Sequence, residues 1–168
     1  VVLVRNIVVK KFVEMPAYVA GANIGWEFVW SFIYHPDSGW IYALSYMGCF
    51  FLDVFIFYSI IRYGTKQPMA PEFKKHFTFF ALTNLVFWVL FSYFFRSEGF
   101  DTTIGANSGY IINVILSLQC LAMLFQVKDT KDFSLALAWA KMLGTALISV
   151  SMFYFYPENH FVQFLGVT

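Results

Sequence analysis

The sequence predicts an all-α fold, a polytopic bundle of transmembrane helices, and two observations carry this prediction. The 168-residue chain is 60% hydrophobic and only 12% charged, which is about half the charged fraction of an ordinary soluble domain. Five apolar runs also reach the roughly 17–25 residues that a helix needs to cross the hydrocarbon core of a bilayer. Because these runs are apolar throughout and do not alternate with polar residues, they argue against a transmembrane β-barrel.

The same composition excludes other classes of protein. A formal net charge of +1 supplies no excess of positive charge to neutralise phosphates, so we expect no nucleic acid partner. The two cysteines, Cys49 and Cys120, fall in different apolar runs and form no disulfide framework. We therefore expect the lipid bilayer to be the main surroundings of the chain.

We expect a single domain, residues 1–168, with five complete spans at 17–34, 39–61, 76–95, 107–127 and 133–156. Turn and charged residues separate these runs. Residues 35–39 form a tight polar turn, residues 62–75 combine charges with glycine and prolines, and residues 128–132 form a charged connector with Asp132 as a helix N-cap. Residues 1–13 have the character of the inner end of a further span, and we expect the parent fold to continue beyond both ends.

The basic residues orient the bundle. Outside the spans, Arg96 alone falls on one side, and the other side receives Arg5, Lys10, Lys11, Arg62, Lys66, Lys74, Lys75, Lys128 and Lys131. Because cytoplasmic loops of membrane proteins carry the excess of lysine and arginine, we expect residues 1–16, 62–75 and 128–132 to be cytoplasmic.

Ionisable residues at bilayer depth are costly and are candidate functional groups. Glu27, Asp53 and Lys141 meet this description. At 1.5 Å per residue, Glu27 lies roughly 15 Å from the charged end of its span, and Asp53, Lys141 and the polar Asn84 each lie roughly 12 Å in. Four spans thus place a polar group at one level, which predicts a common site.

Helical spacing groups further polar and aromatic residues with them. Asn23 and Glu27 are four residues apart, with Trp26 and Trp30 beside them. Comparable stripes occur on the other spans: Ser45, Cys49 and Asp53; Asn84, Trp88 and Ser92; Tyr110, Asn113, Ser117 and Cys120; Lys141, Thr145 and Ser149. An aromatic lining with a few polar groups is typical of a pocket for an apolar ligand.

Several of these residues also have a structural interpretation. Asp53 and Lys141 can form a buried ion pair that specifies packing, Lys141 can snorkel to the interface, or Lys141 can carry a retinal Schiff base with Asp53 as counter-ion. Polar stripes commonly join helices. Glu27 has no basic residue on its own span, so it is protonated or paired with another span. Because a neutral buried carboxyl is a ready proton donor, we favour a proton-handling role. No metal site is expected, since His35 and His160 lack the spacing of ligands.

One segment resembles a known motif. Asn23-Ile-Gly-Trp26-Glu27 resembles the Asn-x-x-Trp-Glu motif in the second helix of the small integral-membrane terpene cyclases of fungal meroterpenoid and indole-diterpene pathways. The likeness continues in order along the chain, from about Val4 to Phe164, through residues 33–36, 140–145 and 154–158.

This resemblance implies a fold of seven helices and an enzyme that uses neither a metal nor another cofactor. It implies proton-initiated cyclisation of a lipophilic prenylated substrate, through its terminal epoxide, with the acid at Glu27 acting as or supporting the general acid. We expect Asp53 to be the partner acid, Asn23 and Asn84 to orient the two acids, and the remaining site residues to bind substrate: Trp26, Trp30, Trp88, Asn113 and Lys141.

The chain also departs from the family pattern. The second important acid of the family is expected in the seventh helix, and this sequence ends before one. Lys141 stands where arginine is usual, and Asp53 stands where asparagine or a similar polar residue is common. Two other functions stay open: a non-catalytic subunit of a larger membrane complex, and a small proton-coupled transporter using Glu27, Asp53 and Lys141. Only Gly21 and Gly25 suggest the broken helix that a transporter would need.

Overall fold

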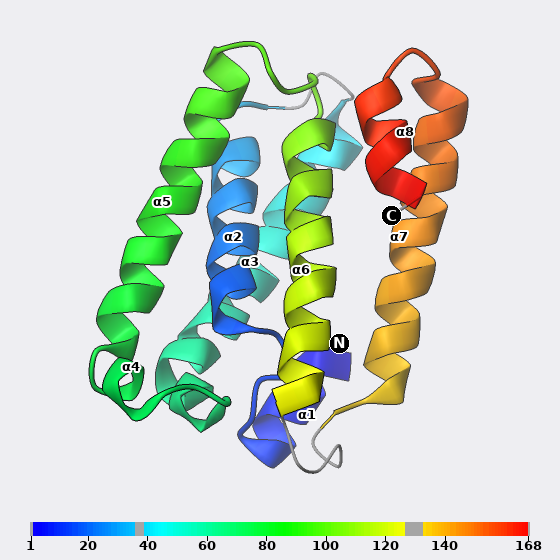
Figure 1. Cartoon of the computed structure of the whole chain (residues 1–168). Helices are drawn as coiled ribbons and strands as arrows, with labels where there is room; N and C mark the ends of the chain where they lie inside the picture. The colour runs from blue at the N-terminus through cyan, green and yellow to red at the C-terminus, as the bar shows by residue number, and fades with distance from the viewer. Residues whose placement is uncertain (1, 36–38, 127–132, 168) are drawn as a thin grey trace.

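The structure, a computed structural model, describes residues 2–35, 39–126 and 133–167. These residues form helices joined by short connections (Figure 1), and no strand occurs among them. In chain order the elements are α1 (Val2–Lys10), α2 (Ala17–Phe28), the π-helix η1 (Val29–Ile33), α3 (Trp40–Tyr63), the 3₁₀-helix η2 (Gly64–Lys66), α4 (Pro71–Lys75), α5 (Phe77–Ser97), α6 (Ala106–Gln126), α7 (Leu135–Phe155) and α8 (His160–Val167). The predicted all-α bundle is confirmed.

The helices begin and end within two residues of the predicted spans. Four of them are long and apolar enough to cross a membrane: α3 with its extension η2, α5, α6 and α7. The first predicted span differs, because α2 has only 12 residues and η1 continues it for five more. Together they are about 25 Å long at 1.5 Å per residue. Residues 36–38 of the predicted 35–39 turn and the connector at 128–132 lie outside the described residues. The N-cap of α7 is Ser134 and not Asp132 as predicted.

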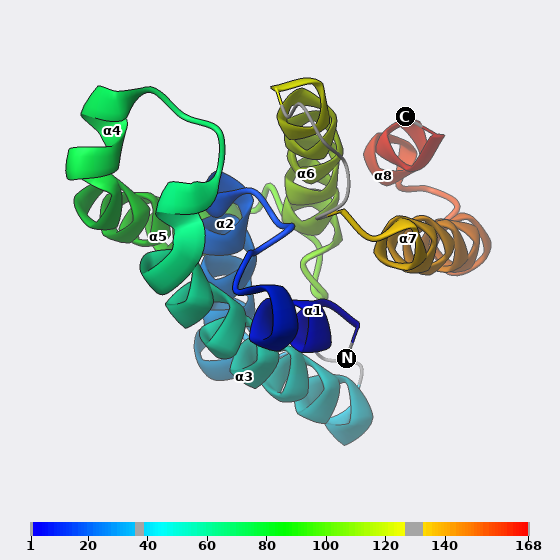
Figure 2. The same cartoon turned by 90° about the horizontal axis from the view of Figure 1, so that it is seen from below.

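The central element is α2, which packs against α3, α5 and α6 and is enclosed by them when the bundle is seen from below (Figure 2). Two glycines allow its close approach to α5. A Cβ atom at Gly25 would lie 3.0 Å from the Cβ atom of Trp88 and 3.1 Å from the backbone nitrogen of Val89, and one at Gly21 would overlap the Asn84 side chain. Small residues at such crossings let helix backbones come together in membranes.

The apolar core lies on either side of α2. One cluster joins α2 to α1, α3 and α5 through buried residues that include Ile7, Ile24, Ile60 and Ala81. A second cluster joins α2 to α5 and α6 through Val19, Ala22, Trp88, Ile112 and Leu116. Burial of these side chains fixes which faces of α2 meet its three neighbours.

One end of the bundle, which we call the basic end, brings residues 5–16 together with the 62–76 segment and the start of α7. The buried side chain of Gln67 joins two of these segments. Its amide nitrogen donates to the carbonyl oxygens of Val13 and Met15, at 3.0 and 2.7 Å, and its amide oxygen accepts from the backbone N–H of Ala17 at 3.1 Å. These bonds satisfy backbone groups at the entry to α2.

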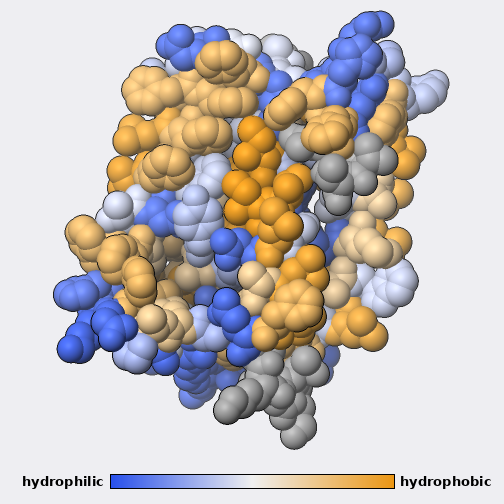
Figure 3. All heavy atoms as spheres, viewed as in Figure 1, coloured by the Kyte–Doolittle hydropathy of each residue, from blue (hydrophilic) through white to orange (hydrophobic). Residues whose placement is uncertain are grey.

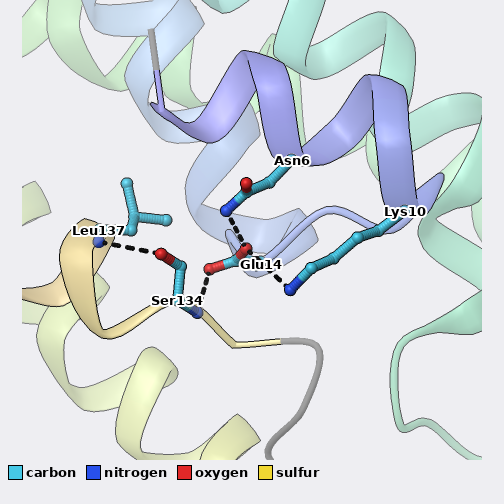
Figure 4. A network of polar contacts seen from close by, with 5 residues as sticks. All are labelled: Asn6, Lys10, Glu14, Ser134 and Leu137. Carbon is cyan, nitrogen blue, oxygen red and sulfur yellow. Dashed lines mark hydrogen bonds and ion pairs between the residues drawn. The ribbon is translucent and has the colours of Figure 1, made fainter.

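Glu14 joins the start of α7 to the basic end (Figure 4). Its carboxylate accepts from the side-chain amide of Asn6 at 2.7 Å and from the backbone N–H of Ser134 at 2.8 Å. Lys10 lies 4.0 Å from the same carboxylate. The hydroxyl of Ser134 in turn accepts from the N–H of Leu137 at 3.3 Å, so Glu14 holds the first turn of α7 against α1.

The outer surfaces of the helices are apolar. The space-filling view shows hydrophobic residues over much of the bundle, with hydrophilic ones gathered mainly toward its ends (Figure 3). The most apolar stretch of α7 is only 6% buried, against 22–28% for the three other candidate spans. Helix α8 packs on both α7 and α6, so α7 is held mainly through its two ends and a few polar bonds.

We expect Gly25→Ala to lower the free energy of unfolding in detergent by about 1–3 kcal/mol, because the added methyl group overpacks the α2–α5 crossing. Gly48→Ala is the matched control, since nothing lies within 4 Å of a Cβ atom there. It should be neutral, or stabilising by up to about 1 kcal/mol through helix propensity. Equal effects of the two substitutions would contradict the close approach.

We expect Glu14→Ala to cost about 2 kcal/mol or more, because it removes two hydrogen bonds to a buried charged group and leaves the Ser134 N–H without its acceptor. The same unfolding measurement tests this. Glu72→Ala, at an exposed residue of α4, should change the free energy by no more than about 0.5 kcal/mol. A Glu14→Ala protein as stable as the Glu72→Ala control would show that the network does not hold α7.

Candidate active site

The site is built on the face of α2 that points away from the glycines. At 100° per residue, Asn23 and Glu27 lie about 200° and 240° around the helix axis from Gly21, and Trp26 lies at about 140°. Trp30 follows on the same side at the start of η1. Trp26 on this face contacts Ser108 in the first turn of α6 and Tyr46 of α3.

Glu27 lies beside Asp53 of α3, close enough for the two carboxyl groups to influence each other electrostatically. Asp53 is 9% exposed, and the side-chain amide of Asn23 is within hydrogen-bonding range of its carboxyl. Two oxygens of this pair, Oε2 of Glu27 and Oδ2 of Asp53, are buried without a hydrogen-bond partner within the described part of the chain. Buried polar atoms are normally satisfied, so these two oxygens are available to a ligand or a proton.

Lys141 approaches the acids from α7. Its Nζ atom donates to the side-chain oxygen of Asn113 on α6, and its positive charge lies near enough to Asp53 for mutual attraction. The side chain stays accessible at the surface. A second bond between the same helices runs from the hydroxyl of Tyr110 to that of Ser149, at 3.0 Å.

Aromatic rings of α2, η1 and α3 form a cluster that we call the aromatic wall. The ring of Trp26 lies 6.2 Å from that of Trp30 and 5.3 Å from that of Tyr46 on α3, between centroids. Trp30 is 1% exposed. Gly105 makes room for this cluster, because a Cβ atom there would lie 2.5 Å from the Trp30 ring; its φ of 72° also favours glycine.

Two predicted site residues lie elsewhere. The amide of Asn84 donates to the backbone oxygen of Tyr18 at 2.7 Å, and Trp88 packs in the core between α2, α5 and α6. Both therefore meet the glycine face of α2, opposite Glu27. Depth in the membrane placed them near the acids, but depth does not specify the direction in which a side chain points.

Other residues of this region have no counterpart in the sequence-based prediction: Tyr46, Asp101 and Ser108. Ser108 accepts a hydrogen bond from the indole N–H of Trp26 at 2.7 Å. The available signal was the spacing of Gly105 and Gly109 at the start of an apolar run, four residues apart, which is typical of a close contact with another segment.

Two surface cavities lie away from the acids. One, of about 530 Å³, is lined by Thr102, Asn107 and residues 155–159 at the end opposite the basic end. The other, of about 440 Å³, is an apolar groove along α5 that ends at Glu98 and Phe100. Among the described residues, His, Cys, Asp and Glu side chains form no group of three that could hold a metal ion.

An all-helical membrane bundle with two neighbouring acids, and with tryptophans on the same side of its central helix, fits the class of membrane-embedded cyclases. Comparison with known families is specific on this point. The family model of the Pyr4-like transmembrane terpene cyclases matches residues 1–162, and the chain belongs to that family. The resemblance seen in the Asn23–Glu27 motif is thereby confirmed.

Individual relatives are distant. The chain is 26% identical over 155 residues to the terpene cyclase macJ of Penicillium terrestre, a match covering 86% of this chain and 58% of that protein. It is 24% identical over 173 residues to the Pyr4-family terpene cyclase mfmH of Annulohypoxylon moriforme, covering 100% of this chain and 71% of that protein. The chain thus spans less than two thirds of macJ. No solved structure matches it at a significant level.

Proposed function

We propose that this protein is an enzyme that cyclises the epoxidised prenyl chain of a lipophilic substrate, and that Glu27 starts the reaction by donating a proton. One observation carries the proposal: Glu27 and Asp53 present buried carboxyl oxygens without a partner among residues 2–35, 39–126 and 133–167, and Glu27 lies on the side of α2 that also carries Trp26 and Trp30. Membership of a terpene cyclase family supports it.

Glu27 suits the role of general acid because it lies inside the bundle next to a second acid. Two carboxyl groups at close range do not both ionise readily, so the pair tends to retain a proton. Such a shared proton is available for transfer to a weakly basic oxygen. Asp53 acts as the partner acid, and the Asn23 amide orients it. Lys141, held by Asn113, balances the charge that remains on the pair after transfer.

The proposed reaction is a net isomerisation. The Glu27 carboxyl gives its proton to the epoxide oxygen, a carbon–oxygen bond of the epoxide breaks, and a hydroxyl group and a carbocation result. The π electrons of neighbouring double bonds then attack in turn and form carbon–carbon bonds. A proton leaves the last cation and returns to the carboxylate pair. Every atom of the substrate is thus retained in the product, and no diphosphate leaves.

The aromatic wall supplies the second part of the mechanism. The faces of Trp26 and Trp30 attract positive charge through cation–π interactions, which contribute about 2 kcal/mol or more at desolvated sites. A dry, aromatic lining also prevents water from capturing the cation early. Asn84 and Trp88 act indirectly in this proposal, because they fix α2 against α5 and so set the direction of Glu27.

We also propose that the basic end faces the cytoplasm. The charges assigned to this side in the sequence support it, and the hydrogen bonds of Gln67 and Glu14 support the grouping of their segments at one end. Substrate then enters from the bilayer, in which a prenylated compound is already dissolved.

We expect Glu27→Gln to lower the rate of cyclisation at least about 100-fold, because loss of a general acid typically costs 10²–10⁴-fold. The assay measures product formed in membranes expressing the protein, supplied with an aromatic alcohol that bears a terminally epoxidised prenyl chain. Asp53→Asn should also lower the rate, by a smaller factor, since Glu27 keeps its proton.

Glu72→Gln, at an exposed residue near the basic end, is the matched control and should retain the wild-type rate at equal expression. Cyclisation by Glu27→Gln at the wild-type rate would overturn the assigned acid. Wild-type membranes that form no cyclised product would overturn the proposed activity and favour a non-catalytic subunit, for which the exposed apolar face of α7 offers a contact surface.

For orientation, we expect a cysteine at Thr65 to react with a membrane-impermeant maleimide in sealed vesicles whose cytoplasmic side faces outward. A cysteine at Ser97 should react only after the vesicles are permeabilised. Both residues are exposed, at opposite ends of the bundle, and the background variant replaces Cys49 and Cys120 by alanine. The reverse labelling pattern would contradict the cytoplasmic assignment.

A further inference from the structure

The residues between α5 and α6 make a chain of hydrogen bonds that ends on Trp26. The indole N–H of Trp26 donates to the Oγ atom of Ser108 at 2.7 Å, and the hydroxyl of Ser108 donates to the Oδ2 atom of Asp101. Ser108 is fully buried and Asp101 is 6% exposed. Two polar side chains are thus buried next to the indole of Trp26.

Asp101 is held by the backbone around it. Its Oδ1 atom accepts from the N–H groups of Thr102 and Asn107, both at 2.9 Å, and from that of Ser108 at 3.4 Å. The last two belong to the first turn of α6, whose N–H groups have no partner within the helix. Burial raises the pKa of Asp101, and its hydrogen bonds with Ser108, Thr102 and Asn107 oppose that rise. With Oδ1 fixed in this way, Oδ2 faces Ser108.

The direction of the bonds follows from the groups involved. A carboxylate only accepts, an indole N–H only donates, and a serine hydroxyl has one proton to give and lone pairs to accept with. The Gly105 carbonyl is a second acceptor for this proton at 3.4 Å, but the Asp101 carboxylate is closer. Because Ser108 thus gives its proton to Asp101, its lone pairs are left for Trp26. Asp101 therefore determines which way Ser108 points, and Ser108 holds the indole.

The same turn of α6 is shaped around the ring of Trp26. A Cβ atom at Gly109 would lie 3.4 Å from the Cζ2 atom of Trp26, and one at Gly105 would lie 2.8 Å from it. Tyr46, whose ring packs edge-on against Trp26, is anchored in turn, because its hydroxyl donates to the Ile104 carbonyl at 2.9 Å. Residues 101–109 thus contact Trp26 directly and through Tyr46.

We infer that Asp101 and Ser108 are positioning residues that fix the indole of Trp26 as a rigid wall beside Glu27, and so keep the carbocation on one cyclisation path. This inference rests on the proposed function, in which Trp26 faces the cation. A loosened indole leaves initiation by Glu27 intact but lets the cation lose a proton early or be captured by water. The expected consequence is a changed product distribution.

The first test is spectroscopic and does not depend on activity. In detergent-solubilised protein labelled with ¹⁵N at the tryptophan indole, each of the five tryptophans gives one N–H signal, and Trp26→Phe assigns that of Trp26. Ser108→Ala should shift this signal upfield through loss of its acceptor, and Ser108→Thr should restore it. Ser117→Ala is the control, because that hydroxyl donates to the carbonyl of Asn113 on its own helix.

The second test compares products from the epoxidised prenyl probe. Ser108→Ala should consume substrate at a rate within about threefold of wild type but divert at least half of it to partly cyclised or hydrated products, and Ser108→Thr should restore the wild-type pattern. Asp101→Asn keeps an acceptor for the backbone N–H groups but presents an amide N–H to Ser108 in place of an acceptor. Its Trp26 indole signal and its product distribution should therefore lie between those of wild type and Ser108→Ala. It also tests the inference if Ser108→Ala does not fold.

The outcomes separate this inference from the proposed function. If the Trp26 signal does not move in Ser108→Ala, the positioning role is overturned. If Ser108→Ala does not fold, the same holds for an unmoved signal in Asp101→Asn. A moved signal with an unchanged product pattern overturns its link to selectivity. If the wild-type protein forms no cyclised product, the proposed function fails, while the indole signal still decides whether Asp101 and Ser108 hold Trp26.

Discussion

The close approach of α2 and α5 is the constraint on which the rest of the structure depends. Because Gly21 and Gly25 have no side chains, α5 can lie directly against α2, and α2 then becomes the central helix of the bundle. If the glycine face of α2 packed against lipid instead of α5, Glu27 would face a different neighbour. Two residues without chemistry of their own thus decide where the Glu27 carboxyl group points.

Buried polar atoms without a partner are the costly feature of this bundle. Most apolar side chains either pack around α2 or face lipid, and neither position is costly. Within the described residues, Glu27 and Asp53 bury oxygens that no protein group satisfies, and Trp88 and Ser92 on α5 bury polar atoms in the same way, which costs free energy. Proteins accept such local cost at functional sites. In the proposed reaction, a ligand that accepts a proton from the Glu27–Asp53 pair relieves part of this cost.

The sequence was sufficient for the membrane class and the helix bounds, because apolar runs and charge placement obey strong rules in a bilayer. It was insufficient for the side-chain neighbours of each helix. Asn84 was expected beside the acids, yet it lies against Gly21 and bonds to Tyr18, since the glycines decide which face of α2 meets α5. The π-helix at Val29–Ile33 and the bond from Trp26 to Ser108, 82 residues apart, depend on tertiary contacts that no local pattern in the sequence encodes.

The network around Glu14 has a consequence for the order in which the chain assembles. Glu14 and its partner Ser134 are 120 residues apart, and a ribosome makes the N-terminal residue first. Its nearby partners Asn6 and Lys10 are made at the start of the chain, whereas Ser134 follows only after the intervening helices. The bond that joins α7 to the basic end therefore forms late.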